Sequence, residues 1–238
     1  MLEREAAATP RPRSLEHALG GETVAVIAEV KRRSPSVGSI REDLDPAAQA
    51  DSYARAGARA ISVLTDGPFF GGSLDDLRDV ARRVAVPVLR KDFILDEVQI
   101  LEARAAGASA VLLIVRALTP ARLAELMRYA AGWGLDTLVE IHDGGELAVA
   151  LASGARIVGV NSRDLDTFEI DTRRAWDILR GVPATVLVVA ESGMATPGDV
   201  EAAAAAGADA VLVGTALSAS ARPGGLLGTL TRTPRHGR

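Results

Sequence analysis

The chain has 238 residues, 48% of them hydrophobic and 24% charged, with a net charge of −4 and no cysteine. This length and composition fit one globular domain, and the acidic balance argues against a nucleic-acid or anionic-membrane partner. The lack of cysteine excludes disulfides, a thiolate nucleophile and cysteine-bound metal, and it suits a reducing compartment.

The N-terminal residues are acidic and have no apolar core, so they do not resemble a secretory signal peptide. No apolar run reaches the roughly 20 residues of a membrane span. We therefore expect a cytoplasmic protein. Residues 1–20 are predicted as a short polar extension with one short helix at Ser14–Leu19, and residues 21–238 as a single domain. The tail after Leu230 is expected to be frayed.

Four similar phrases recur, at residues 55–65, 105–115, 152–162 and 205–215. Each reads as the end of an Ala-rich helix, a glycine that can close it in the left-handed conformation, and a buried strand without polar alternation. The period of about 50 residues leaves room for a second strand and helix between copies. Four double βα units predict an α/β fold, the (β/α)8 or TIM barrel, with its chemistry at the carboxyl ends of the strands.

Segments rich in Val, Ile and Leu are the predicted strands: 24–30, 60–64, 87–90, 110–115, 136–140, 157–160, 185–190 and 210–213. The segments between them begin with N-cap or first-turn signals such as Asp45-Pro46, Thr119-Pro120 and Thr196-Pro197. A doubly wound open sheet is the alternative fold. However, KRRSPSVG follows the first strand where that fold would have a glycine fingerprint opening a helix.

In a barrel, the residues just past each strand share one cavity. A charge that directly follows a buried strand is itself half-buried, so it must pair with another charge or serve chemistry. The polar residues and glycine at these positions are Glu29, Lys31, Thr65, Lys91, Asp92, Arg116, Glu140, His142, Asn161, Arg163, Glu191, Ser192, Gly214 and Thr215. Two lysines and three glutamates converge, and this mixture of signs is expected to hold a lysine pKa near the working pH.

Seven segments at strand ends resemble one known family. They are AEVKRRSPSVG, SVLTDGPFFGGS, PVLRKDFI, LVEIH, GVNSRDL, AESG and VLVGTAL. Their order and spacing, over about residues 24–220, resemble indole-3-glycerol phosphate synthase of tryptophan biosynthesis. The resemblance implies conversion of 1-(2-carboxyphenylamino)-1-deoxyribulose 5-phosphate to indole-3-glycerol phosphate, with loss of carbon dioxide and water and without metal or organic cofactor.

The resemblance also implies catalytic roles. Lys91 matches the acid that protonates the ribulosyl carbonyl oxygen as the aromatic carbon attacks. Lys31 matches the lysine that holds the substrate carboxylate. Glu140 matches the base, and Glu29 a second acid or orienting group. The family positions that bond substrate hydroxyls or orient the lysines are matched by Asn161, Arg163 and Glu191.

Binding residues follow from the same resemblance and from the barrel. Phosphate is expected where the last two strands end, because backbone N–H groups at a following helix terminus attract anions. The residues there are Ser192, Gly193, Gly214 and Thr215, with Ser34 adding a hydroxyl from the first loop. The apolar wall around the aromatic ring is assigned to Phe70, Phe93 and Leu112. The expected partner is thus a small sugar phosphate, with no nucleic acid or membrane, and a monomer is the working assumption.

Each assignment has a structural alternative. Lys91 and Asp92 could form a surface ion pair, and Glu29 and Lys31 a structural pair in the barrel mouth. Glu140 could cap the helix that follows it. Some other members of the set could serve only to orient neighbours or to pack: Asn161, Arg163 and Glu191 as an orienting network, and Thr215, Phe70 and Phe93 as core residues. His142 is interpreted as a loop or capping residue, because no other His or Cys has metal spacing.

The chain departs from the family at three points. Family members carry some 40 residues before the first strand, forming a helix over the catalytic mouth, and this chain has about half that. Thr65-Asp66 replaces the common Thr-Glu, and Thr215 the usual Glu or Ser. Two alternative functions remain: phosphoribosylanthranilate isomerase, whose known form uses a cysteine base that this chain lacks, and a non-catalytic or diverged phosphate-binding paralogue.

Overall fold

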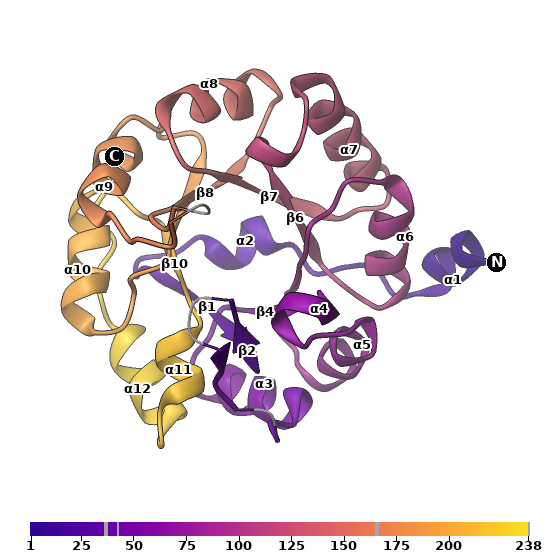
Figure 1. The fold of residues 1–238 in the computed structure, drawn as a ribbon, viewed down its shortest axis with the longest axis horizontal. Helices are drawn as coiled ribbons and strands as arrows, with labels where there is room; N and C mark the ends of the chain where they lie inside the picture. The colour runs from indigo at the N-terminus through magenta and orange to yellow at the C-terminus, as the bar shows by residue number, and fades with distance from the viewer. Residues whose placement is uncertain (36–37, 42, 165–166, 238) are drawn as a thin grey trace.

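The computed structural model describes residues 1–35, 38–41, 43–164 and 167–237, so parts of the KRRSPSVG and GVNSRDL motifs lie outside it. Eight parallel strands close into a barrel, with β1 paired to both β4 and β10 (Figure 1). The strands are Ala25–Val30 (β1), Ala60–Leu64 (β4), Val88–Lys91 (β5), Ala110–Ile114 (β6), Asp136–Ile141 (β7), Ile157–Asn161 (β8), Leu187–Glu191 (β9) and Ala210–Val213 (β10). The predicted barrel is confirmed, and each predicted strand overlaps one of these.

Helices surround the barrel (Figure 1). The outer helices are Pro46–Arg55 (α3), Leu74–Arg83 (α5), Glu97–Ala105 (α6), Pro120–Gly132 (α7), Gly144–Ala152 (α8), Thr172–Arg180 (α9), Pro197–Ala205 (α10) and Pro223–Leu230 (α12). Shorter elements are Gly67–Phe70 (α4), Val115–Ala117 (η1), Thr215–Ala219 (α11) and the hairpin of Arg33–Ser34 (β2) with Gly38–Ser39 (β3). The predicted caps are confirmed: Asp45, Thr119 and Thr196 each accept a first-turn backbone N–H.

Alternation along each strand decides which side chains enter the barrel. In β1, Val26 and Ala28 pack between sheet and helices, whereas Ala25 and Ile27 pack inside the barrel. Glu29, two residues after Ile27, therefore points inward above the apolar interior. The same alternation applies in four other strands, where an inward-facing residue is followed two positions later by a polar residue that also faces inward. The pairs are Leu89 and Lys91, Leu138 and Glu140, Gly159 and Asn161, and Val189 and Glu191.

The N-terminal extension closes the opposite end of the barrel. The short helix predicted at Ser14–Leu19 is present as Leu15–Leu19 (α2). Ser14 caps it, and it buries Leu15 and Leu19 against the barrel interior. The Ser14 hydroxyl and the Glu16 backbone N–H each donate to the Asp136 carboxylate at the start of β7, at a distance of 3.0 Å. Residues 14–19 thus lie at the amino-terminal end of the strands and do not cover the catalytic mouth. Sequence reasoning missed a further helix, Leu2–Ala8 (α1), which packs against α6.

The prediction of a frayed tail after Leu230 is wrong for residues up to 235. Thr233 is buried, and its carbonyl accepts the backbone N–H of Val24 at 2.9 Å. Arg235 donates its backbone N–H to Glu22 and forms an ion pair with the buried Asp209. The tail is therefore held against the entry to β1. Within the described ranges, no helix combines the length and apolar character needed to cross a bilayer.

Candidate active site

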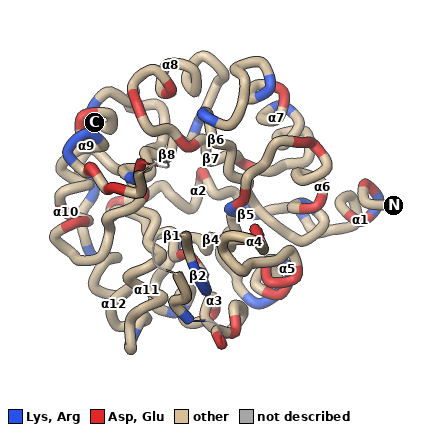
Figure 2. Tube along the Cα trace, viewed as in Figure 1, with Lys and Arg blue, Asp and Glu red and all other residues tan. Residues whose placement is uncertain are grey.

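A cavity of about 440 Å³ opens at the carboxyl ends of the barrel strands. Every predicted catalytic and binding residue lines it: Glu29, Lys31, Ser34, Phe70, Lys91, Phe93, Leu112, Glu140, Asn161, Arg163, Glu191, Ser192, Gly193, Gly214 and Thr215. Figure 2 shows blue and red segments at the centre of the barrel as well as on the outer helices. The structure thus brings the whole predicted set together, while the role of each residue stays a prediction.

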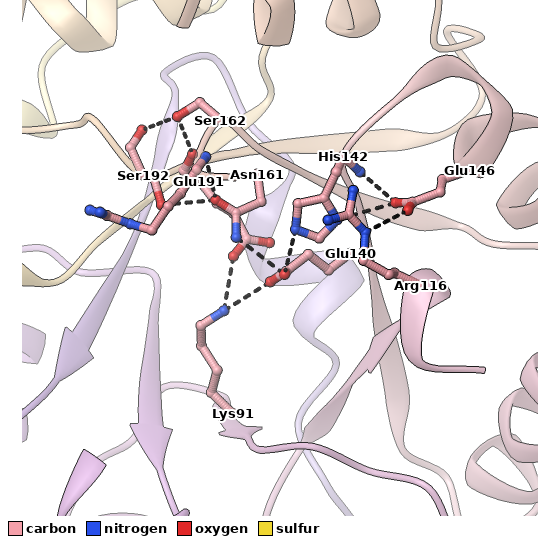
Figure 3. Close-up of polar contacts among 10 residues, drawn as sticks. Lys91, Arg116, Glu140, His142, Glu146, Asn161, Ser162, Glu191 and Ser192 are labelled. Carbon is pink, nitrogen blue, oxygen red and sulfur yellow. Dashed lines mark hydrogen bonds and ion pairs between the residues drawn. The ribbon is translucent and has the colours of Figure 1, made fainter. Parts of the chain in front are cut away.

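Lys91 lies at the centre of a buried ion cluster (Figure 3). Its Nζ is 3.1 Å from Oε2 of Glu140 and 3.1 Å from Oε2 of Glu191. Burial lowers the pKa of Lys91, but the two carboxylates outweigh burial and place it well above its ordinary value. Lys91 is therefore a stable ammonium in the free protein, and the expectation of a lysine pKa near the working pH is wrong for this residue.

The two glutamates beside Lys91 differ in charge state. Burial and the nearby Glu140 raise the pKa of Glu191 to about 7, against the opposing effect of Lys91. Burial also opposes ionisation of Glu140, but Lys91 and His142 hold its pKa far below its usual range. One site thus holds a permanent carboxylate and a second carboxyl group that gains or loses its proton near neutral pH.

Lys31 and Glu29 form a second ion pair, with Nζ 3.0 Å from Oε1. Gly214 packs directly on this pair: a Cβ at that position would lie 2.3 Å from Oε1 of Glu29 and 3.2 Å from Nζ of Lys31. A larger residue after β10 would therefore displace the end of the Glu29 side chain.

Asn161 joins the carboxylate cluster to the neighbouring loop (Figure 3). Its Nδ2 donates to Oε1 of Glu140 at 3.2 Å, and its Oδ1 accepts the Ser192 hydroxyl at 2.9 Å. The Ser162 hydroxyl donates to the backbone carbonyls of Glu191 and Ser192. The turn that follows β9 is held in a strained shape, with φ of 65° at Ser192 and 75° at Gly193.

The structure excludes three of the alternative interpretations. Lys91 does not pair with Asp92, because Asp92 accepts from Arg90 at 2.9 Å and from the Thr65 hydroxyl at 2.5 Å. Glu140 does not cap α8, because Asp143 holds that position and accepts the backbone N–H of Glu146. Nor are the two aromatic wall residues core plugs: Phe93 is 42% exposed and Phe70 is half-buried, and both line the cavity.

Comparison with known proteins agrees with this geometry. The family model of indole-3-glycerol phosphate synthase matches residues 1–224. Proteins of that name from Mycobacteroides abscessus and Leptospira interrogans are each 48% identical to the chain. The first alignment covers 99% of this chain and 86% of the relative, and the second covers 85% and 80%. The chain belongs to the indole-3-glycerol phosphate synthase family.

Solved structures with low sequence identity share the fold alone. A 3-hexulose-6-phosphate synthase from Salmonella typhimurium has a TM-score of 0.70 at 14% identity, covering 88% of this chain and 97% of its own. A thiamine phosphate pyrophosphorylase from Pyrococcus furiosus has a TM-score of 0.65 at 16% identity, covering 91% and 96%. The assignment of the chain as a carboxy-lyase of tryptophan biosynthesis comes from its membership of the synthase family and not from these structural similarities.

Three residues of this family member escaped the sequence reasoning as parts of the site. Gly159 lies in the middle of β8, where an added Cβ would meet Oε1 of Glu191 at 2.0 Å. Its signal was present, because a glycine inside an apolar strand often marks a close approach. Buried Arg90, near the end of β5, forms ion pairs with Asp92 and Glu102. His142, expected as a loop or capping residue, lies in a loop but is fully buried against Glu140.

Proposed function

We propose that this chain converts 1-(2-carboxyphenylamino)-1-deoxyribulose 5-phosphate to indole-3-glycerol phosphate, releasing carbon dioxide and water, in the cavity at the carboxyl ends of its strands. The observation that carries the proposal is the ammonium of Lys91, held between Glu140 and Glu191 beside the separate Lys31–Glu29 pair. Family membership supports the same reaction. A cytoplasmic location is proposed from the sequence alone.

Lys91 is the proposed acid of the ring-closing step. As the aromatic carbon attacks the ribulosyl carbonyl carbon, the carbonyl oxygen gains negative charge and takes a proton from Nζ. A partly buried ammonium at the end of a strand stabilises this developing charge without reorganisation. The carbon–carbon bond is thus formed before the carboxylate leaves as carbon dioxide, which restores the aromatic ring.

Glu140 and Glu191 are proposed for the final dehydration. This step removes a carbon-bound proton and expels a hydroxyl group as water, so it needs a base and an acid at one place. Glu140 is ionised throughout and accepts the carbon-bound proton. Glu191, with a pKa of about 7, holds a proton in a substantial fraction of molecules and donates it to the hydroxyl. Glu29 is assigned to orienting Lys31.

Binding is assigned to the remaining cavity residues. Lys31 pairs with the substrate carboxylate until it leaves, and Phe70, Phe93 and Leu112 contact the aromatic ring. The phosphate lies against Ser192–Gly193 and Gly214–Thr215, with the Ser34 hydroxyl nearby. Arg163 and Asn161 face the sugar hydroxyls. What supports this division is that all these residues line one cavity, which brings charged, polar and aromatic side chains together.

The test is turnover of the carboxyphenylamino substrate, followed by the appearance of indole fluorescence. Wild-type protein is expected to turn over, and Lys91→Met to lose about 100-fold or more in kcat. A folded wild-type protein that binds substrate without product would support the non-catalytic paralogue instead. Conversion of phosphoribosylanthranilate, with no indole formed, would support the isomerase.

A further inference from the structure

His142 lies directly behind Glu140, in the loop between β7 and α8. Its side chain is fully buried, and the two ring nitrogens face two different carboxylates (Figure 3). Nε2 is 3.4 Å from Oε1 of Glu140, and Nδ1 is 3.1 Å from Oε2 of Glu146. Lys91 contacts Glu140 through the other oxygen, Oε2. Glu140 is therefore held between one cation that faces the cavity and a ring on its opposite side.

Glu146 is itself fixed in place. Its Oε2 also accepts the backbone N–H of His142 at 2.7 Å, and its Oε1 accepts Nε of Arg116 at 3.2 Å. Asp143, the N-cap of α8, accepts the backbone N–H of Glu146. Signs then alternate along the line from Arg116 through Glu146, His142 and Glu140 to Lys91 (Figure 3). The line runs from the exposed Arg116 to Glu140 and Lys91, which line the cavity.

The charge of the ring follows from this geometry. A neutral imidazole has one N–H and carries no charge, whereas an imidazolium has two N–H groups and a positive charge. The 3.1 Å contact of Nδ1 with Glu146 is a hydrogen bond, and the 3.4 Å contact of Nε2 with Glu140 is an ion-pair contact without a hydrogen bond, so the cation is the form that both carboxylates stabilise. The charged groups that face the ring are Glu140 on β7 and Glu146 on α8, with Lys91 on β5 and Arg116 on η1 beyond them. Burial lowers the pKa of His142, but the two carboxylates outweigh burial and raise it to about 9. His142 is thus a cation at neutral pH.

We propose that His142 is a positioning residue for Glu140: its imidazolium, anchored by Glu146, holds Oε1 of Glu140 so that Oε2 stays on Lys91 and toward the reacting atoms. The inference rests on the proposed catalytic role of Glu140. A second cation behind the carboxylate favours its ionised form, so Glu140 enters the dehydration as a carboxylate that can accept a proton. Loss of a residue that orients a functional side chain in this way typically lowers activity by about 10- to 100-fold.

The experiment measures kcat and KM between pH 6 and 10 for four proteins: wild type, His142→Gln, Glu146→Gln and the control His17→Gln. His17 is exposed on α2 at the far end of the barrel. Wild type and the control should lose kcat in two steps as pH rises, one near pH 7 as Glu191 loses its proton and an alkaline limb through about pH 9 as His142 loses its own. His142→Gln should lower kcat by about 10- to 100-fold with KM within about threefold, and should lack this alkaline limb. Glu146→Gln should move the limb to lower pH, because the ring loses one of its two anions.

A second readout is the titration of the imidazole by NMR, with His142 identified as the signal that persists in both His17→Gln and His236→Gln, because the chain has three histidines. A midpoint near pH 9 in wild type that falls in Glu146→Gln supports the inference, and this measurement decides it if His142→Gln does not fold. Wild-type kcat in His142→Gln, or a reduced kcat with the limb still near pH 9, would overturn it. Absence of turnover in wild-type protein would instead remove the proposed function, so the two failures are distinct.

Discussion

Oε1 of Glu191 occupies the space next to Gly159, where an added Cβ would come within 2.0 Å of it. The two residues lie on neighbouring strands, β9 and β8, and both face the barrel interior. Because the backbone of β8 is fixed by pairing on both sides, the carboxylate would have to move. Glycine in this strand is therefore what allows Glu191 to reach Lys91.

The first prediction follows from this contact. Gly159→Ala should displace the Glu191 carboxylate from Nζ of Lys91 and lower kcat by about 10-fold or more, since misplacement of about 1 Å can cost about 100-fold. Steady-state kinetics with the carboxyphenylamino substrate measures this. Gly154→Ala is the matched control for space, because nothing lies within 4 Å of a Cβ there. Its positive φ of 85° is expected to cost stability but not kcat. Normal kcat in Gly159→Ala would show that Glu191 works from another position.

The second prediction concerns stability and pH. The pKa of Glu191 is raised from 4.5 to about 7, so between these values the folded protein keeps a proton that the unfolded chain has lost. Stability contributed by this group is fully present below about pH 4.5 and is lost as pH rises through about 7. Relative to Glu191→Gln, wild type should lose about 1 to 3 kcal/mol in free energy of unfolding between pH 5 and 8. Denaturant unfolding at several pH values measures the difference.

The control for this measurement is Glu201→Gln, a change on the exposed face of α10. It should leave the pH dependence of wild type unchanged. If the difference between wild type and Glu191→Gln stays constant from pH 5 to 8, then Glu191 is ionised over that whole range and is not the proton donor in the dehydration.

The third prediction separates stability from catalysis. Leu15 and Leu19 of α2 are fully buried at the amino-terminal end of the barrel. Leu19→Ala should lower the free energy of unfolding by about 2 to 5 kcal/mol through the lost burial and the cavity left behind. At temperatures where the variant stays folded, KM should be unchanged, because the substituted residue is at the far end from the site. A large rise in KM would show that the extension influences the catalytic mouth.

The barrel could be predicted because each of its strands is buried on both faces and so reads as an apolar run. The site could be predicted because parallel strands bring their carboxyl ends together, which places Glu29, Lys91, Glu140 and Glu191 at one cavity. The pairing among these charges could not be predicted. Lys91 has Asp92 beside it in sequence, yet it pairs with carboxylates from β7 and β9.

Other features depended on contacts that a local pattern does not contain. Arg235 and Thr233 order the tail through Asp209 and Val24, residues that are adjacent only in the fold. The proton affinity of Lys91 depends on how many carboxylates reach it, and two direct contacts raise it beyond the expected range. His142 gave no sequence signal for its position, because a histidine two residues beyond a strand carboxylate is equally compatible with an exposed loop.

The last prediction distinguishes the two lysines by role. If Lys31 holds the substrate carboxylate, Lys31→Ala should weaken substrate binding as well as turnover, because a buried carboxylate loses its partner. It should also leave Glu29 as an unpaired buried carboxylate, so Lys31→Arg, which keeps the charge, is the matched variant. Lys91→Ala should harm mainly the chemical step, because its proton is given up in the transition state. Substrate affinity is measured by binding titration and the chemical step by single-turnover rates. Both should fall for Lys31→Ala, whereas for Lys91→Ala the rate should fall and the affinity should change little. Equal loss of binding in the two alanine variants would mean that both lysines contact the substrate in the ground state, and the assignment of separate roles to Lys31 and Lys91 would then be wrong.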